Sequence, residues 1–249
     1  MILFGFIHVY AICILLGIIT GVASAMILAP KYDISRDALT DLILIFIPAG
    51  IVGARIYYVI FNLDYYLNNP SEIIMINNGG LAFYGGLIGV VAVLVIYTRI
   101  KKLSIINFLD IFAPMCLFGQ AIGRWGNFFN QEAHGGEVTR KYLEGWRIIP
   151  KFVIDGMNID GTYYLPTFYF ESLACLIGAI IIFILLYKKI TKPLDGAAFY
   201  LVWYGIFRTV IESQRSDSLY LGPIKVSMLL SALLVLAGLI IFIVRRKKK

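Results

Sequence analysis

Long runs of apolar residues dominate the chain and alternate with mostly short polar connections. A helix needs about 20 mostly apolar residues to cross a bilayer. Because lipid hydrocarbon cannot hydrogen-bond a backbone, spanning segments are helices or closed barrels, and runs without period-two alternation favour helices. We predict seven helices, over residues 9–29, 41–61, 80–98, 104–122, 166–187, 196–213 and 223–244. The pattern therefore predicts an all-α integral membrane protein that forms a single polytopic domain over residues 1–249.

Composition supports this class. Of the chain, 60% is hydrophobic and only 15% is charged, whereas a soluble domain is about one quarter charged. A net charge of +7 would suggest nucleic acid in a soluble protein. Here most Lys and Arg lie in short connections between apolar runs, so we expect a lipid bilayer as partner and no nucleic acid.

The basic residues also predict an orientation. Thirteen of them lie at one set of helix ends, in the connections near 31–36, 99–102 and 188–192 and in the terminal segment 245–249. Cytoplasmic loops carry an excess of Lys and Arg. With seven spans, this predicts a multi-pass protein of the plasma membrane whose C-terminus is cytoplasmic and whose N-terminus lies outside. An N-terminal apolar stretch long enough to span argues against a cleavable signal peptide.

One connection is long. Residues 123–165 are polar and rich in Gly and aromatic residues, and they fall on the outer side of the predicted topology. Loops of this length are usually functional or form a small unit of their own. We therefore expect a small extracytoplasmic cap between the fourth and fifth helices.

The cysteines and glycines favour structural roles. Cys13, Cys116 and Cys175 lie in separate apolar runs without a CxxC pair, which is typical of buried thiols rather than of disulfides or metal ligands. No metal or cofactor fingerprint is visible in the sequence. Pairs of small residues four apart predict close helix packing, and they are Gly17/Gly21, Gly50/Ala54, Gly85/Gly89 and Gly119/Gly123.

Ionisable residues within apolar runs are the first candidates for function, because a charge inside a membrane is costly. They are Arg55, Arg124, Glu171, Arg208 and Glu212. Arg208 and Glu212 are spaced i, i+4, so a simple intrahelical ion pair is the structural alternative. For Arg124 the alternative is an interfacial side chain that reaches the lipid headgroups.

Polar residues gather around two of these helix ends. Asn127, Asn130 and Glu132 follow Arg124, which favours a site that binds an anion. Glycines flank Tyr84 and leave its hydroxyl accessible, although an interfacial tyrosine is an alternative for Tyr84 and still more for Tyr10. His134 is either a general base or a surface histidine.

Five segments resemble those of the prolipoprotein diacylglyceryl transferase family. Residues 123–132 resemble its signature G-R-x-G-N-F-x-N-x-E, and 80–89 resemble its Gly-rich third-helix motif. The remaining matches lie at 165–171, 208–215 and 8–11, and all five follow the family order. There are departures: many members carry histidine where Tyr84 stands, Leu165 replaces another histidine, and His8 and Val9 replace Arg and Trp.

The resemblance implies a reaction. Members of this family transfer the diacylglyceryl group of phosphatidylglycerol to the lipobox cysteine of a prolipoprotein signal peptide, which forms a thioether and releases glycerol phosphate. No cofactor is implied. The catalytic residues expected here are Arg124, Arg208, Glu132 and Tyr84. Substrate binding is expected from Arg124, Asn127, Arg208, Glu212, Tyr10, Glu171 and Gly135.

The mechanism predicted at this stage has Arg124 and Arg208 grip the lipid phosphate and stabilise the leaving group. Asn127 and Glu132 would orient Arg124, and Glu212 would hold Arg208. Because tyrosine has a pKa near 10, Tyr84 would be a poor base at neutral pH, and the identity of the base stays open. The main alternative function is a transporter of anions or protons, with an intramembrane protease, a phosphotransferase or a scaffold less favoured.

Overall fold

The computed structural model describes residues 2–3, 7–76, 79–215, 220–221 and 224–247. The chain forms two units, one of Met1–Leu28 with Leu109–Lys249 and one of Ala29–Phe108.

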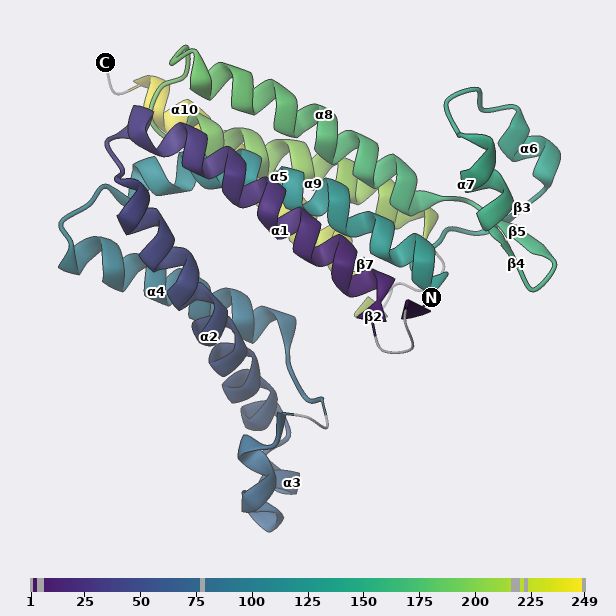
Figure 1. The fold of residues 1–249 in the computed structure, drawn as a ribbon, viewed down its shortest axis with the longest axis horizontal. Helices are drawn as coiled ribbons and strands as arrows, with labels where there is room; N and C mark the ends of the chain where they lie inside the picture. The colour runs from purple at the N-terminus through teal and green to yellow at the C-terminus, as the bar shows by residue number, and fades with distance from the viewer. Residues whose placement is uncertain (1, 4–6, 77–78, 216–219, 222–223, 248–249) are drawn as a thin grey trace. The chain divides into compact units, whose positions relative to one another are not determined.

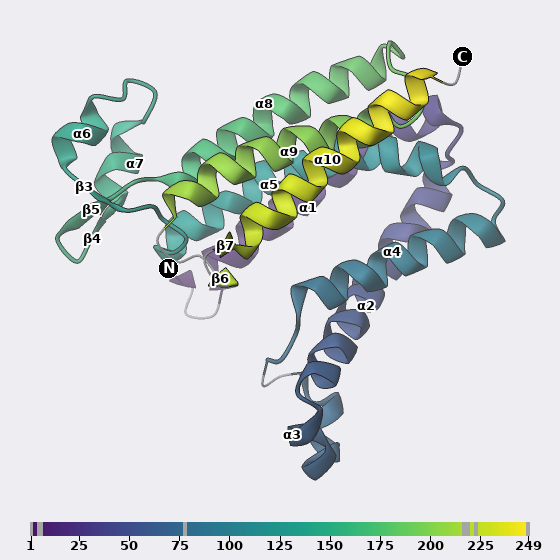
Figure 2. The ribbon, with the colours of Figure 1, turned by 180° about the vertical axis from the view of Figure 1, so that it is seen from behind.

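The first unit is built on long helices that lie side by side in both views (Figures 1 and 2). They are α1 (Val9–Leu28), α5 (Ile105–Asn130, from Leu109 on), α8 (Thr167–Tyr187), α9 (Asp195–Gln214) and α10 (Val226–Lys247). Helix α9 packs along both α8 and α10. Two short antiparallel pairs accompany them, β1 (Ile2–Leu3) with β2 (Ile7–His8) and β6 (Tyr220–Leu221) with β7 (Ile224–Lys225).

Glycines bring α1 against α5. A Cβ atom placed on Gly17 would lie 2.8 Å from the carbonyl oxygen of Gly119, and one on Gly21 would lie 2.6 Å from that of Met115. Any side chain at these two positions would therefore collide with the α5 backbone. The close packing predicted from the small-residue spacing is confirmed for this helix pair.

A small insertion lies at the end of the bundle where α5 ends and α8 begins (Figures 1 and 2). Its elements are β3 (Glu137–Val138), α6 (Arg140–Glu144), α7 (Lys151–Gly156), β4 (Asn158–Ile159) and β5 (Thr162–Tyr164). The strands form one antiparallel sheet in the order β3-β5-β4. Asp160 and Gly161, with φ of 50° and 88°, form the two-residue hairpin turn between β4 and β5.

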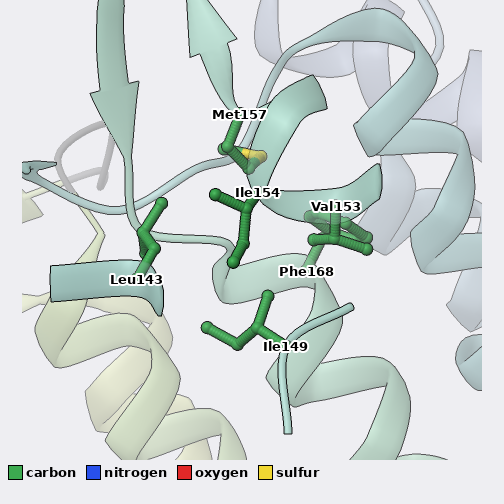
Figure 3. Close-up of a cluster of buried hydrophobic side chains, with 6 residues drawn as sticks. All are labelled: Leu143, Ile149, Val153, Ile154, Met157 and Phe168. Carbon is green, nitrogen blue, oxygen red and sulfur yellow. The ribbon is translucent and has the colours of Figure 1, made fainter. Parts of the chain in front are cut away.

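The insertion has a hydrophobic core of its own (Figure 3). Val153 from α7 and Leu143 from α6 are fully buried, and Phe168 from the first turn of α8 joins them. Arg140 forms ion pairs on the surface of the insertion: its guanidinium lies 2.7 Å from Glu144 on α6 and 2.9 Å from Asp155 on α7. The hydrogen bond to Glu144 is the main reason why the pKa of Arg140 lies above its ordinary value.

The second unit contains η1 (Ala29–Tyr32), α2 (Arg36–Phe61), α3 (Leu63–Asn68), η2 (Pro70–Ile74) and α4 (Phe83–Ile100). Ser35 caps α2 by accepting a hydrogen bond of 3.1 Å from the Ala38 backbone N–H. Helices α2 and α4 pack closely: a Cβ atom on Gly53 would lie 2.5 Å from the carbonyl oxygen of Gly85.

Six helices of the described chain are long and apolar enough to cross a membrane. The predicted class of all-α membrane protein is therefore confirmed at this level. Helix α9 is not among the six, because its turns carry Arg208, Glu212 and several Tyr and Trp residues. Whether residues 1–249 act as one domain stays a prediction.

The predicted end of the fourth helix was wrong. Helix α5 continues to Asn130 instead of ending at 122, because Trp125 and Phe128 pack against the core of the insertion. The insertion therefore begins at Gln131, where positive φ angles at Gln131 and Ala133 turn the chain.

Candidate functional site

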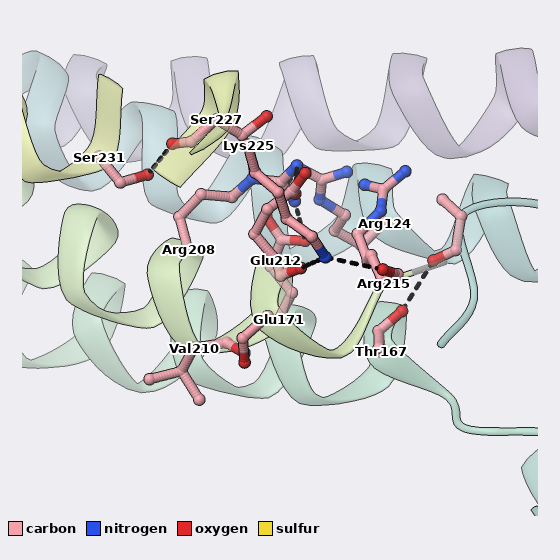
Figure 4. A network of polar contacts seen from close by, with 12 residues as sticks. Arg124, Thr167, Glu171, Arg208, Val210, Glu212, Arg215, Lys225, Ser227 and Ser231 are labelled. Atoms are coloured by element: carbon pink, nitrogen blue, oxygen red, sulfur yellow. Dashed lines mark hydrogen bonds and ion pairs between the residues drawn. The ribbon is translucent and has the colours of Figure 1, made fainter. Parts of the chain in front are cut away.

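Two arginines and two glutamates from three helices meet inside the first unit (Figure 4). Glu171 on α8 lies between the arginines: its Oε1 is 2.7 Å from Nη2 of Arg124, and its Oε2 is 3.3 Å from Nη1 of Arg208. Arg208 also pairs with Glu212, one turn further along α9. We call Arg124, Glu171, Arg208 and Glu212 the arginine–glutamate cluster.

The cluster is largely shielded from solvent. The side chains of Glu171 and Glu212 are 3% and 2% exposed, whereas those of Arg208 and Arg124 are 13% and 23% exposed. Buried charges persist only when they are paired, and two guanidinium groups here balance two carboxylates. The arginines are the more accessible members, so an incoming anion would meet them first.

The geometry of Arg124 differs from that of Arg208. Both contacts of Arg208 are hydrogen bonds, whereas Oε1 of Glu171 accepts no hydrogen bond despite its short distance to Arg124. The N–H groups of Arg124 are therefore not aimed at that oxygen. Tyr204 on α9 lies within hydrogen-bonding reach of Arg124, and a guanidinium carries five N–H donors in all.

Local contacts hold α5 and α8 in register beside the cluster. The hydroxyl of Ser172, next to Glu171, donates a hydrogen bond of 2.6 Å to the carbonyl of Ala121, one turn before Arg124. Further along, Thr167 at the start of α8 donates one of 2.8 Å to Ala133 (Figure 4). These bonds help to place Arg124 and Glu171 opposite each other.

Both ends of α9 are fixed by charged side chains. Buried Asp110 on α5 accepts hydrogen bonds from the backbone N–H groups of Leu194 at 2.8 Å and Ala197 at 3.1 Å. At the other end, Nζ of Lys225 donates to the carbonyls of Glu212 at 2.7 Å and Arg215 at 2.9 Å. A carboxylate at the N-terminus and an ammonium at the C-terminus complement the helix dipole, and together they set the position of Arg208.

The residues that follow Arg124 form a second polar group. Asn127 and Asn130 donate to Oε1 of Glu132 at 3.1 and 3.4 Å. The carboxylate that contacts Arg124 is Glu171, and the expected orienting of Arg124 by Asn127 and Glu132 stays a prediction. The expected roles of Glu132 and Asn127 at the substrate stay predictions.

Trp125 links the cluster to the insertion. Its ring stacks on Phe152 of α7 with centroids 6.0 Å apart and meets Phe168 edge-on at 5.5 Å. Trp125 is the neighbour of Arg124 on α5, so the insertion core supports the turn of helix that carries this arginine.

Tyr10 and Gly135 also lie in the first unit. The ring of Tyr10 covers Gly126, where an added Cβ atom would lie 2.7 Å from its Cδ2, so Tyr10 lies beside the Arg124 segment. Gly135 pairs with Arg215 as an isolated β-bridge, and a Cβ atom added at Gly135 would lie 3.0 Å from the carbonyl oxygen of Gln214. His134 stacks on Tyr164 with centroids 4.1 Å apart. Substrate contacts of Tyr10 and Gly135 stay predictions.

Tyr84 and Arg55 belong to the second unit. Tyr84 lies in the first turn of α4 with 45% of its surface exposed. Its catalytic role stays a prediction. Arg55 is buried on α2, where its guanidinium donates hydrogen bonds to backbone carbonyls of the same unit.

Sequence reasoning missed Asp110, Lys225 and Tyr204. Asp110 was visible as an acidic residue in an apolar run, a signal that applied to it as well as to Glu171. Lys225 gave the same signal, as a basic residue inside the predicted helix 223–244, but the sequence could not show that it reaches the end of α9.

The fold and the site define a helical membrane protein with a buried, arginine-rich polar site suited to an anion. A comparison with known families matches residues 2–244 to prolipoprotein diacylglyceryl transferase. A phosphatidylglycerol–prolipoprotein diacylglyceryl transferase of Streptococcus pyogenes serotype M5 (strain Manfredo) is 51% identical over 98% of this chain and 92% of its own. One of Bacillus cytotoxicus is 45% identical over 96% of this chain and 87% of its own.

The chain belongs to the prolipoprotein diacylglyceryl transferase family, and it is a transferase. The comparisons give no support to the transporter alternative.

Proposed function

We propose that this protein transfers the diacylglyceryl group of phosphatidylglycerol to the cysteine thiol of a prolipoprotein, with Arg124 and Arg208 holding the lipid phosphate. The observation that carries the proposal is the meeting of both guanidinium groups at Glu171, with 2.7 and 3.3 Å between the charged atoms. Family membership supplies the reaction, and this geometry suggests how the chain performs it.

Charge and donor geometry favour a phosphate at this place. The four charges of the cluster cancel, and Lys225 and Arg215 at the end of α9 add positive charge. This excess favours an anion such as a phosphodiester. The planar fork of arginine binds two phosphate oxygens at once, and the site is shielded enough for such contacts to be strong.

The arginines would also lower the barrier. In the proposed step the cysteine sulfur of the substrate attacks the carbon of the diacylglyceryl unit that bears the phosphate. A C–S bond forms while the C–O bond from this carbon to the phosphate breaks. The electron pair leaves with the oxygen, and the thiol proton passes to a base or to the departing phosphate. The phosphate thereby changes from a diester monoanion to a monoester with greater negative charge. Donors already aimed at it bind this developing charge more tightly than the ground state.

The nucleophile comes from the substrate, so the enzyme needs no cysteine of its own. A free thiol has a pKa of about 8.5 and is only slightly ionised at neutral pH. Guanidinium groups close by favour the thiolate, which reduces the demand on a general base. Tyr84 is proposed to hydrogen-bond the substrate, because a neutral tyrosine accepts protons poorly.

The proposed topology has seven spans, with α9 as the sixth along the chain. In support, α9 has 20 residues, packs against α8 and α10, and pairs its Arg208 with carboxylates at Glu171 and Glu212. The basic last turn of α10 is assigned to the cytoplasm, and the N-terminus and the insertion to the outer side. The insertion would then be a small extracytoplasmic cap on the helix bundle.

The test is a transfer assay. Purified protein is incubated with phosphatidylglycerol and a lipobox peptide, and the product is followed by mass. We expect a diacylglyceryl mass gain that requires the peptide cysteine and falls at least a hundredfold in Arg124→Gln and Arg208→Gln, by about 3 kcal/mol of lost transition-state stabilisation. Arg147→Gln, which removes an exposed arginine of the insertion, is the control. Parent-like transfer by both site variants would refute the proposed phosphate clamp.

A further inference from the structure

Arg55 on α2 has an unusual set of partners in the second unit. Its Nε donates to the carbonyl of Ile73 at 2.7 Å, its Nη1 to those of Gly79 and Gly80, and its Nη2 to those of Glu72 and Met75, at 2.6 to 3.1 Å. A guanidinium has five N–H donors, so each one meets a backbone carbonyl. Arg55 is 8% exposed and also lies over the ring of Tyr66, 5.2 Å from its centroid.

These bonds fix the backbone that leads into α4. Two of the five acceptors lie in η2, and the other three lie between η2 and α4, all on the connection from α2 to α4. Lysine could not reproduce the arrangement, because its ammonium has three donors and no planar fork. The same contact explains why residue 80 is a glycine: its φ is 74°, and a Cβ atom there would collide with Nη1 of Arg55.

A second contact sets the register of α4 on α2. The backbone N–H of Ala82 donates to the carbonyl of Ala54 at 3.1 Å, one residue before Arg55. Gly85 then packs directly against Gly53 and Ala54. With Gly85 turned toward α2, the neighbouring Tyr84 keeps 45% of its surface exposed, and its ring meets Phe83 at 5.8 Å.

We propose that Arg55 is a positioning residue for the transfer reaction, acting through Tyr84. Its guanidinium holds the backbone of residues 72–75 and of Gly79 and Gly80, so that α4 begins with the Tyr84 hydroxyl presented to the substrate. This inference rests on the proposed substrate contact of Tyr84. It assigns to Arg55 no contact with substrate.

A double-mutant cycle tests the inference. Transfer is measured for Arg55→Lys, Tyr84→Phe and the double variant, and thermal stability is recorded for each. Tyr84→Phe is expected to lower kcat/KM about three- to tenfold, the effect of one hydrogen bond. Arg55→Lys is expected to lose a similar factor, and the double variant to be no worse than either single variant. Arg99→Lys, at the exposed other end of α4, is the control and should match the parent.

The outcomes separate the two claims. If Tyr84→Phe matches the parent, the proposed substrate contact fails, and the role of Arg55 fails with it. If Tyr84→Phe is impaired but the two losses multiply in the double variant, Arg55 does not act through Tyr84, and only the inference fails. Where Arg55→Lys does not fold, Gly80→Ala replaces it, since its methyl group displaces the same guanidinium. The same lack of additivity is then expected.

Discussion

Replacing Glu171 by glutamine removes the carboxylate that both arginines share, while the shape of the side chain stays nearly the same. Glu171 is 3% exposed, and its partners Arg124 and Arg208 are 23% and 13% exposed. Removing one partner of a buried ion pair costs about 3–5 kcal/mol, because the remaining charges are left uncompensated. Arg208 keeps Glu212, and Arg124 is partly solvated, so we expect the low end, about 3 kcal/mol.

Thermal unfolding in detergent measures this loss. For a chain of this size, 1 kcal/mol corresponds to about 2–4 °C in Tm, so Glu171→Gln should lower Tm by roughly 6–12 °C. Glu144→Gln makes the same chemical change at the exposed pair with Arg140, where both side chains are over 40% exposed, and it should stay near the parent. Phosphatidylglycerol should restore part of the Tm lost in Glu171→Gln, because its phosphate supplies the missing negative charge. Equal Tm values for the two variants would refute the shared-carboxylate reasoning.

Three further predictions concern the support of the cluster. Asp110→Ala leaves two backbone N–H groups of α9 without their acceptor and should cost about 1–3 kcal/mol in the same unfolding assay; an unchanged Tm would contradict the capping role. Lys225→Met removes the donor at the other end of α9 and should lower kcat/KM several-fold, by about 1 kcal/mol or more, whereas Lys247→Met at the end of α10 should not. Arg124→Lys keeps the positive charge but loses the planar guanidinium that binds two phosphate oxygens, so transfer should fall by about tenfold or more. Full activity would show that a point charge suffices.

The six apolar helices could be predicted because each follows from a local property, a run of apolar residues long enough to cross a bilayer. The pairing of Arg208 with Glu212 could be anticipated in the same way, from i, i+4 spacing on one helix. Most predicted helix ends lie close to the observed ones. The end of α5 was missed because Trp125 and Phe128 pack against the insertion core, and tertiary packing does not show in hydrophobic periodicity.

The centre of the site depends on contacts between helices far apart in the sequence. The sequence could identify Arg124, Glu171 and Arg208 as candidates, because a charge within an apolar run is energetically unfavourable in a membrane. It could not show that one carboxylate contacts both arginines. The same limit applies to Asp110 and Lys225, whose partners are backbone groups of another element. It applies to Arg55 as well, since nothing in the sequence shows that five carbonyls surround it.

The central claim is that Arg124 and Arg208 hold one lipid phosphate. The most direct measurement is an experimental structure of the protein with phosphatidylglycerol bound, determined in lipid nanodiscs. The account predicts a single phosphate with N–H groups of both guanidinium groups within hydrogen-bonding distance, about 3 Å. A phosphate bound at another place, with both arginines still engaged only by Glu171 and Glu212, would contradict it.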